Sequence, residues 1–133
     1  MKNTDQDMVD NLTNKRRDTD ASGDATFAQG RDGNGNLTDV KESSIQENGS
    51  VIHAETQVLD DLKGAPTPKT VAVDQIPCTN CTHDLKNSDI DKVIVPSRLD
   101  KRTGEITDAS PKTAARKAAE KGEIVLPREI KID

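Results

Sequence analysis

Four residues in the middle of the chain have side chains that can bind a metal ion and move a proton. His53 and Glu55 form the short motif His-Ala-Glu, and Cys78 and Cys81 belong to the motif Pro-Cys-Thr-Asn-Cys. An imidazole nitrogen and two thiolates are favoured zinc ligands, and a site with three protein ligands leaves a fourth position for water. Three ligands are more typical of a catalytic zinc site than of a structural one.

Glu55 is also unusual because of its place on a predicted helix. Residues 50–64 are predicted to form this helix, with Ser50 as the N-cap and Gly64 just beyond its end. Its apolar stripe consists of Val51, Ile52, Val58, Leu59 and Leu62. Glu55 falls in the middle of the stripe, and a buried carboxylate must be paired, bound to a metal or protonated. We therefore expect Glu55 to face a zinc-bound water and to take its proton.

The two motifs fit a site built where two helices begin. His53 and Glu55 are about 160° apart on an ideal helical wheel, so they converge only if His53 lies at the loose start of the helix. Cys78 and Cys81 have the i, i+3 spacing of a first helical turn, and Pro77 suits a helix start. The positive ends of both helix dipoles would favour thiolate ligands there.

Other interpretations of these residues remain open. His83 could act as a fourth ligand in a closed structural zinc site, although a helix would point it away from Cys81. Cys78 and Cys81 could also form a disulfide or a redox dithiol. Neither the disulfide nor the dithiol explains why His53 and Glu55 precede the cysteines.

The elements that must position these residues are those of an α/β domain. We predict a mixed five-stranded sheet flanked by helices in residues 23–133, with the order β-β-α-β-α-β-α-β. The first two strands flank a predicted turn at residues 32–36, and the later strands are predicted at 70–76, 91–98 and 123–133. The two further helices are predicted at residues 77–89 and 110–122. Residues 99–108 are expected to form a small hairpin or an irregular excursion, and Pro127 favours an edge strand.

Composition limits the remaining possibilities. Residues 1–22 are almost entirely polar without a sustained period, which predicts a flexible leader that contributes little to folding. No apolar run approaches the length that spans a membrane, so we expect no membrane partner. The chain has a net charge of −5 and an acidic first half, far from the strongly basic character of a dedicated nucleic-acid binder.

The ordered pair of motifs strongly resembles the zinc-dependent cytidine deaminase superfamily. The resemblance covers residues 24–132 in the order of elements, but only His-Ala-Glu and Pro-Cys-Thr-Asn-Cys in sequence. It implies a cytidine deaminase-like fold in which His53, Cys78 and Cys81 bind Zn²⁺ and Glu55 shuttles protons. In that family hydroxide attacks C4 of cytosine or C6 of adenine and ammonia is released, with cytosine favoured here.

The resemblance also suggests substrate contacts. Asn48 lies upstream of the first motif, where family members commonly hold the base or ribose, and Ala54 lies within that motif. Pro77 precedes the first cysteine. Phe27 is the only aromatic residue able to stack a base apart from a histidine, although a core position on the first strand suits it better.

Within the family, the short chain and the acidic first half resemble the deaminase toxin domains of bacterial polymorphic toxins. This implies a domain secreted as part of a larger toxin and delivered into the cytoplasm of a rival cell. Its substrate would be DNA or RNA, and an immunity protein would be its partner. The alternatives are a cytoplasmic deaminase of free nucleosides or nucleotides and a zinc-stabilised binding module without turnover, which the intact Glu55 disfavours.

Overall fold

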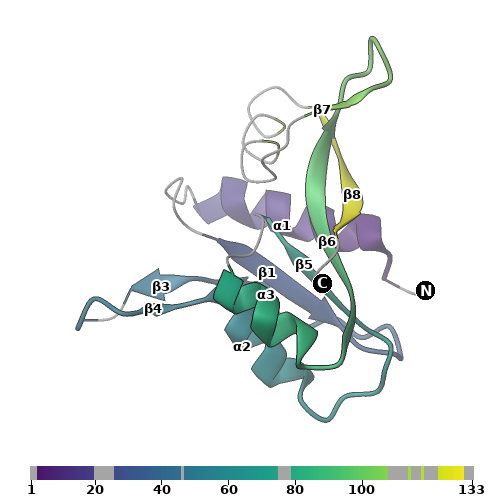
Figure 1. Cartoon of the computed structure of the whole chain (residues 1–133). Coiled ribbons are helices and arrows are strands. Elements are labelled where there is room, and N and C mark those ends of the chain that lie inside the picture. The colour runs from purple at the N-terminus through teal and green to yellow at the C-terminus, as the bar shows by residue number, and fades with distance from the viewer. Residues whose placement is uncertain are drawn as a thin grey trace.

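A mixed β-sheet forms the centre of the structure, a computed structural model (Figure 1). The structure describes residues 3–19, 26–45, 47–74, 79–107, 114, 118 and 123–130. The strands of the sheet are β1 (Phe27–Arg31), β2 (Lys41–Glu42), β5 (Lys69–Val73), β6 (Ile90–Leu99), β7 (Ile106–Thr107) and β8 (Ile124–Ile130). They follow the order β2–β1–β5–β6–β7, and β8 also pairs with β6. Only β5 and β6 run parallel. The predicted α/β class with a mixed sheet is confirmed.

The two central strands are apolar because both of their faces are covered. Residues 71–73 of β5 and 93–95 of β6 are all buried. In β8, Pro127 lies opposite Pro96 of β6, so two residues without an N–H face each other. The described part of the chain gives β8 no partner besides β6, as its proline predicted.

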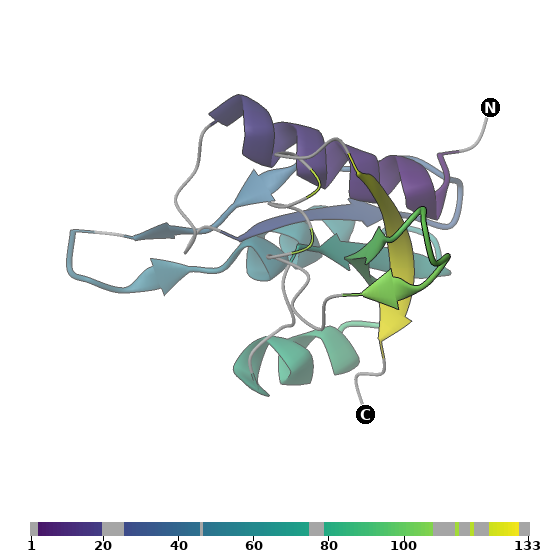
Figure 2. The same cartoon turned by 90° about the horizontal axis from the view of Figure 1, so that it is seen from above.

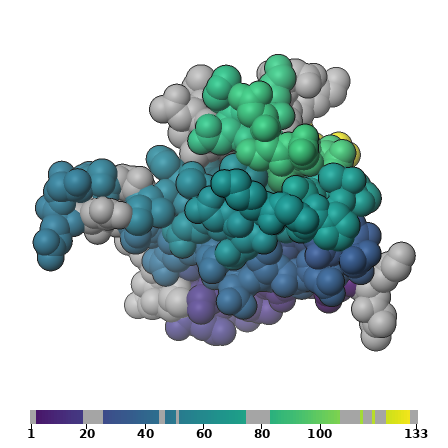
Figure 3. Space-filling view, turned by 90° about the horizontal axis from the view of Figure 1, so that it is seen from below, coloured from purple at the N-terminus to yellow at the C-terminus, as the bar shows by residue number. Residues whose placement is uncertain are grey.

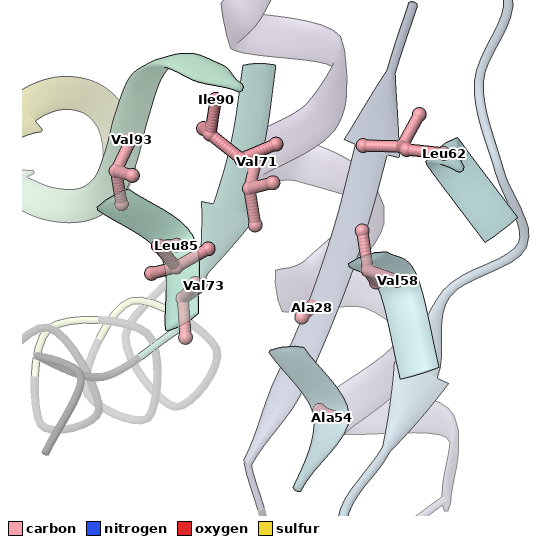
Figure 4. Packing of buried hydrophobic residues seen from close by; sticks show 9 residues of the cluster. All are labelled: Ala28, Ala54, Val58, Leu62, Val71, Val73, Leu85, Ile90 and Val93. Atoms are coloured by element: carbon pink, nitrogen blue, oxygen red, sulfur yellow. The ribbon is translucent and has the colours of Figure 1, made fainter. Parts of the chain in front are cut away.

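Helices cover both faces of this sheet (Figures 1 and 2). Helix α1 (Asp5–Thr19) lies on one face, and α2 (Ala54–Leu62) and α3 (Thr79–Lys86) lie on the other. Figure 4 shows how side chains of α2 and α3 pack with those of β1, β5 and β6. Within the predicted helix at 110–122 the structure describes only Ala114 and Ala118, which are both helical and buried.

The first helix corrects the prediction of a flexible leader at residues 1–22. Met8, Val9 and Leu12 lie on one side of α1 and are completely buried against the sheet. Three apolar side chains at this spacing suffice to anchor a helix that is polar elsewhere, because only the buried face must be apolar. Asp5 also forms ion pairs with Arg31 of β1 and Lys92 of β6.

A second correction concerns the start of α2. Val51 and Ile52, predicted as its first turn, instead form β4 (Val51–Ile52), which pairs with β3 (Ser44–Ile45) in a hairpin that protrudes from the body (Figure 3). Gly49 has a positive φ of 84° in the turn, a conformation that glycine adopts easily. The side chain of Ile52 is therefore 36% exposed, whereas Val58 and Leu62 are buried as predicted.

Helix α2 packs closely on β1 because β1 contains a glycine at the contact. A Cβ atom on Gly30 would lie 2.7 Å from side-chain atoms of both Val58 and Leu62. The bare backbone of Gly30 thus fixes how near α2 can approach the sheet. Within the described residues, no helix has the length and apolar character needed to cross a membrane.

Candidate active site

Glu55 lies in the first turn of α2 and is buried, with 3% of its surface exposed. The prediction that its carboxylate points inward is confirmed. Its Oε1 atom is buried and accepts no hydrogen bond from any residue that the structure describes. A buried polar atom left without a partner costs about 1–3 kcal/mol, and more when it is charged. Oε1 of Glu55 is therefore available to a hydrogen-bond donor that is not among the described residues.

His53 is the N-cap of α2 and not a member of its first turn. Its backbone is extended, with φ −75° and ψ 143°, and its carbonyl accepts a hydrogen bond from Gln57 N at 3.3 Å. The imidazole makes no capping hydrogen bond, and His53 is exposed. Because His53 precedes the helix, the separation of about 160° that applies inside a helix does not hold for His53 and Glu55.

Helix α3 begins at Thr79, directly after Cys78 in the sequence. The backbone of Cys81 lies in the first turn of α3, while its side chain and the whole of Pro77 and Cys78 lie outside the described residues. Figure 1 shows α2 and α3 beside each other, both beginning near the base of the β3–β4 hairpin. The structure thus brings the two predicted helix starts to one end of the molecule.

Two of the three predicted zinc ligands, Cys78 and the side chain of Cys81, lie outside the described residues. Among the described side chains, no three His, Cys, Asp or Glu residues gather so that they could hold a metal ion. His83 is exposed on α3, and its Nε2 lies 3.0 Å from Nδ2 of Asn87, one turn later in the same helix. Its role as a fourth ligand stays a hypothesis.

The predicted substrate residues lie in different places. Phe27 is completely buried on the α1 face, with its ring centroid 5.1 Å from Cζ of Arg16, so the favoured expectation of a core position is confirmed and the ring is not exposed to stack a base. Asn48 lies in the turn of the β3–β4 hairpin, and its Oδ1 accepts hydrogen bonds from the backbone N–H and hydroxyl of Ser50. The side chain of Ala54 is buried in the core beneath α2.

A groove of about 410 Å³ lies between α2 and α3, and Glu55 is not part of its lining. Its lining includes Asp60 and Lys63 near the C-terminal end of α2, and Asp84 and Asp89 in and after α3. Thr56, which follows Glu55 in the first turn of α2, also lines this groove, whereas His53 and Glu55 do not. We therefore assign the candidate active site to the helix starts.

Comparisons of the sequence with protein-family models and with curated proteins found no match. Inference about function therefore depends on the two motifs and on the chemistry of the residues around the helix starts.

Two buried, charged residues outside this site escaped the sequence interpretation. Asp74, at the end of β5, and Arg16, in α1, form a completely or nearly completely buried ion pair. The available signal was an aspartate that directly follows the apolar run of residues 71–73. Its partner is 58 residues away in a segment predicted to be unstructured, so the pairing could not be foreseen.

Proposed function

We propose that this protein is a zinc-dependent hydrolase that deaminates a nucleobase, with cytosine preferred over adenine. The observation that carries the proposal is the buried Oε1 of Glu55, which has no donor among the described residues and lies two residues after His53 at a helix start. A structural carboxylate would be expected to have its donors in place. A carboxylate that exchanges protons with a substrate and a water must keep an oxygen available to them.

The donor set of the two motifs suits zinc. His53, Cys78 and Cys81 would hold the ion, since one imidazole and two thiolates are ligands that Zn²⁺ prefers. A zinc ion held by these residues would lower the pKa of a bound water molecule to about 7. This choice of ligands stays a prediction.

Glu55 performs the proton transfers of the proposed reaction. Its carboxylate accepts a proton from the attacking water as the oxygen bonds to C4 of the base, and then delivers that proton to the departing amine. The C4–N bond breaks, so that water and cytosine yield uracil and ammonia. With 3% of its surface exposed, Glu55 is shielded from bulk water.

We further propose that the base belongs to DNA or RNA and that the domain acts as a toxin delivered into a rival cell's cytoplasm, with an immunity protein as partner. This part is supported by the resemblance to the toxin domains alone.

One observation favours a second candidate, a deaminase of free nucleosides or nucleotides. Phe27 is the only Phe, Tyr or Trp in the chain, and it is buried in the core. The protein therefore has no such ring on which a strand of nucleic acid could stack its bases, a common source of affinity for single strands.

Zinc content and ammonia release test the proposal together. We expect the purified protein to hold one zinc per chain by elemental analysis, and Cys78→Ala with Cys81→Ala to lose it. The control is His83→Ala, which should keep the metal; loss of zinc from this variant would favour the closed structural site.

Ammonia release from cytidine, single-stranded DNA, duplex DNA and RNA then distinguishes the nucleic-acid substrate from the free nucleoside. Full zinc occupancy in the double variant, or no release from any of these and from their adenine counterparts, would refute the proposal.

A further inference from the structure

A lysine of the central sheet is almost completely buried in the lining of the groove between α2 and α3. The exposed fraction of Lys69, the first residue of β5, is 7%, and Lys69 is one of the groove's lining residues. Burial of an ammonium group is costly unless the group is paired, because the charge loses its water. The amine of Lys69 therefore requires a partner.

The strand directs the side chain of Lys69 toward the groove. Successive residues of a strand point to opposite faces of the sheet. Thr70 faces α1, because its hydroxyl accepts a hydrogen bond from Arg31 at 3.3 Å and Arg31 pairs with Asp5 of α1. Val71 faces the other way and packs in the core beneath α2 and α3. Lys69 shares the face of Val71, so its side chain lies on the α2–α3 side of the sheet.

No residue that the structure describes supplies a partner for this amine. Lys69 donates a hydrogen bond to Oδ2 of Asp91 at 2.7 Å, but from its backbone N–H, and Nζ pairs with none of the described residues. The other lysine of the groove, Lys63, is exposed, so water solvates its amine. A buried lysine with a purely structural role would be expected to have its partner in place. Nζ of Lys69 is therefore available to an anionic group that enters the groove.

The rest of the groove offers the opposite charge and an apolar surface. Asp84 of α3 and Asp89, shortly after α3, contribute exposed carboxylates to the lining. Leu59 of α2 contributes an apolar side chain that packs against the core. A buried cation, exposed anions and apolar surface thus share a volume of about 410 Å³.

We propose that this groove binds a small linear zwitterion, a molecule with a carboxylate at one end and an amine at the other. The carboxylate pairs with Nζ of Lys69, the amine pairs with Asp84 or Asp89, and the methylene chain packs on Leu59. A simple anion fits less well because the aspartates repel it, and a bare metal cation fits less well because Lys69 repels it. This inference does not rest on the proposed function, since the groove includes none of the motif residues.

Matched probes test the class of ligand. The probes are γ-aminobutyrate, δ-aminovalerate and ε-aminocaproate, each compared by isothermal titration calorimetry with the alkanoate and the alkylamine of the same chain length. At least one amino acid should bind about 10–100-fold more tightly than either of its single-ended counterparts, because a hydrogen bond to a charged group contributes about that factor. If none of the amino acids binds more tightly than its counterparts, the proposal is wrong.

Lys69→Met tests whether the probe binds in the groove. The change keeps an unbranched apolar stem and removes the ammonium group, so affinity for the best probe should fall about 10–100-fold. The melting temperature should hold or rise, because a buried charge without a partner has been removed. Lys86→Met, at an exposed position of α3 outside the groove, is the control and should bind the probe as the wild type does.

Asp84→Asn combined with Asp89→Asn tests the other end of the ligand and leaves the core untouched. Asparagine tolerates the positive φ of 59° at residue 89, so this variant should fold even if Lys69→Met does not. It should weaken binding of the best probe by about the same factor and should not weaken binding of the matching alkanoate. Wild-type affinity for the probe in Lys69→Met, or in the aspartate variant, would overturn the proposal.

Discussion

Glu55 and Asp74 are the two carboxylates that are buried in the described part of the chain, and their surroundings differ. Asp74 accepts hydrogen bonds from Arg16 and from the backbone of Phe27. Glu55 leaves its Oε1 without a donor among the described residues. One chain thus contains both a carboxylate that stabilises the arrangement of elements and one whose free oxygen suits proton transfer.

A third carboxylate, Asp5, gives a pH-dependent prediction. Burial raises the pKa of the Asp5 carboxyl, but hydrogen bonds from Lys92 and Arg31 together with their charges outweigh this effect and lower the pKa below its usual 3.8. A folded pKa below the unfolded one gives stability that is present above the unfolded value and is lost as pH falls through the folded value. We expect Asp5→Asn to be less stable than the wild type at pH 7, and the difference to shrink below pH 3.8.

Urea unfolding at several pH values measures this difference. Asp10→Asn, on the exposed side of the same helix, is the control and should change stability less at pH 7. If the free energy of unfolding of Asp5→Asn differed from that of the wild type by a constant amount from pH 7 down to pH 2, the ion pairs of Asp5 would not be the source of the difference.

At the scale of elements, α1 is an integral part of the domain. Leu12→Ala removes a completely buried side chain from the contact between α1 and the sheet. We expect it to lower the free energy of unfolding by about 2–5 kcal/mol, the usual cost of such a truncation in a core. Thermal unfolding of this variant and of the exposed control Asn14→Ala tests it. Equal melting temperatures in the two variants would mean that α1 does not hold to the sheet as the structure shows.

The elements that the sequence could predict are those whose pattern is local. The apolar runs of β5 and β6, and the turn between β1 and β2, follow from residue types a few positions apart. Helix α1 was missed because three apolar side chains among many polar ones leave little periodic signal. The start of α2 was misplaced because Val51 and Ile52 continue its helical stripe while they pair with β3.

In the candidate site too, features that depend on local sequence could be predicted and features that depend on distant contacts could not. The burial of Glu55 and the place of His53 at a helix start were predictable, since both depend on the local pattern of α2. The pairing of Arg16 with Asp74 and the burial of Phe27 beneath α1 depend on contacts distant in sequence. The core position of Phe27 could be predicted from its strand, but neither its contact with Arg16 nor the pairing of Arg16 with Asp74 could be.

At the scale of the whole molecule, the sheet separates two layers with different roles. The α1 layer contains Phe27 and the Arg16–Asp74 pair, and the α2–α3 layer contains Glu55 at the start of α2. The Arg16–Asp74 pair joins α1 to the residue that directly follows β5.

The most direct test of the central claim is Glu55→Gln, which keeps the shape of the side chain but cannot accept a proton. Zinc should stay bound while ammonia release falls by at least about 10²–10⁴-fold, the range for general acid–base groups. Stability should hold or rise because a neutral amide replaces a buried carboxylate. Asp60→Asn, an exposed change in the same helix, should leave zinc content and turnover unchanged. A Glu55→Gln protein that is destabilised yet still releases ammonia at the wild-type rate would contradict the account.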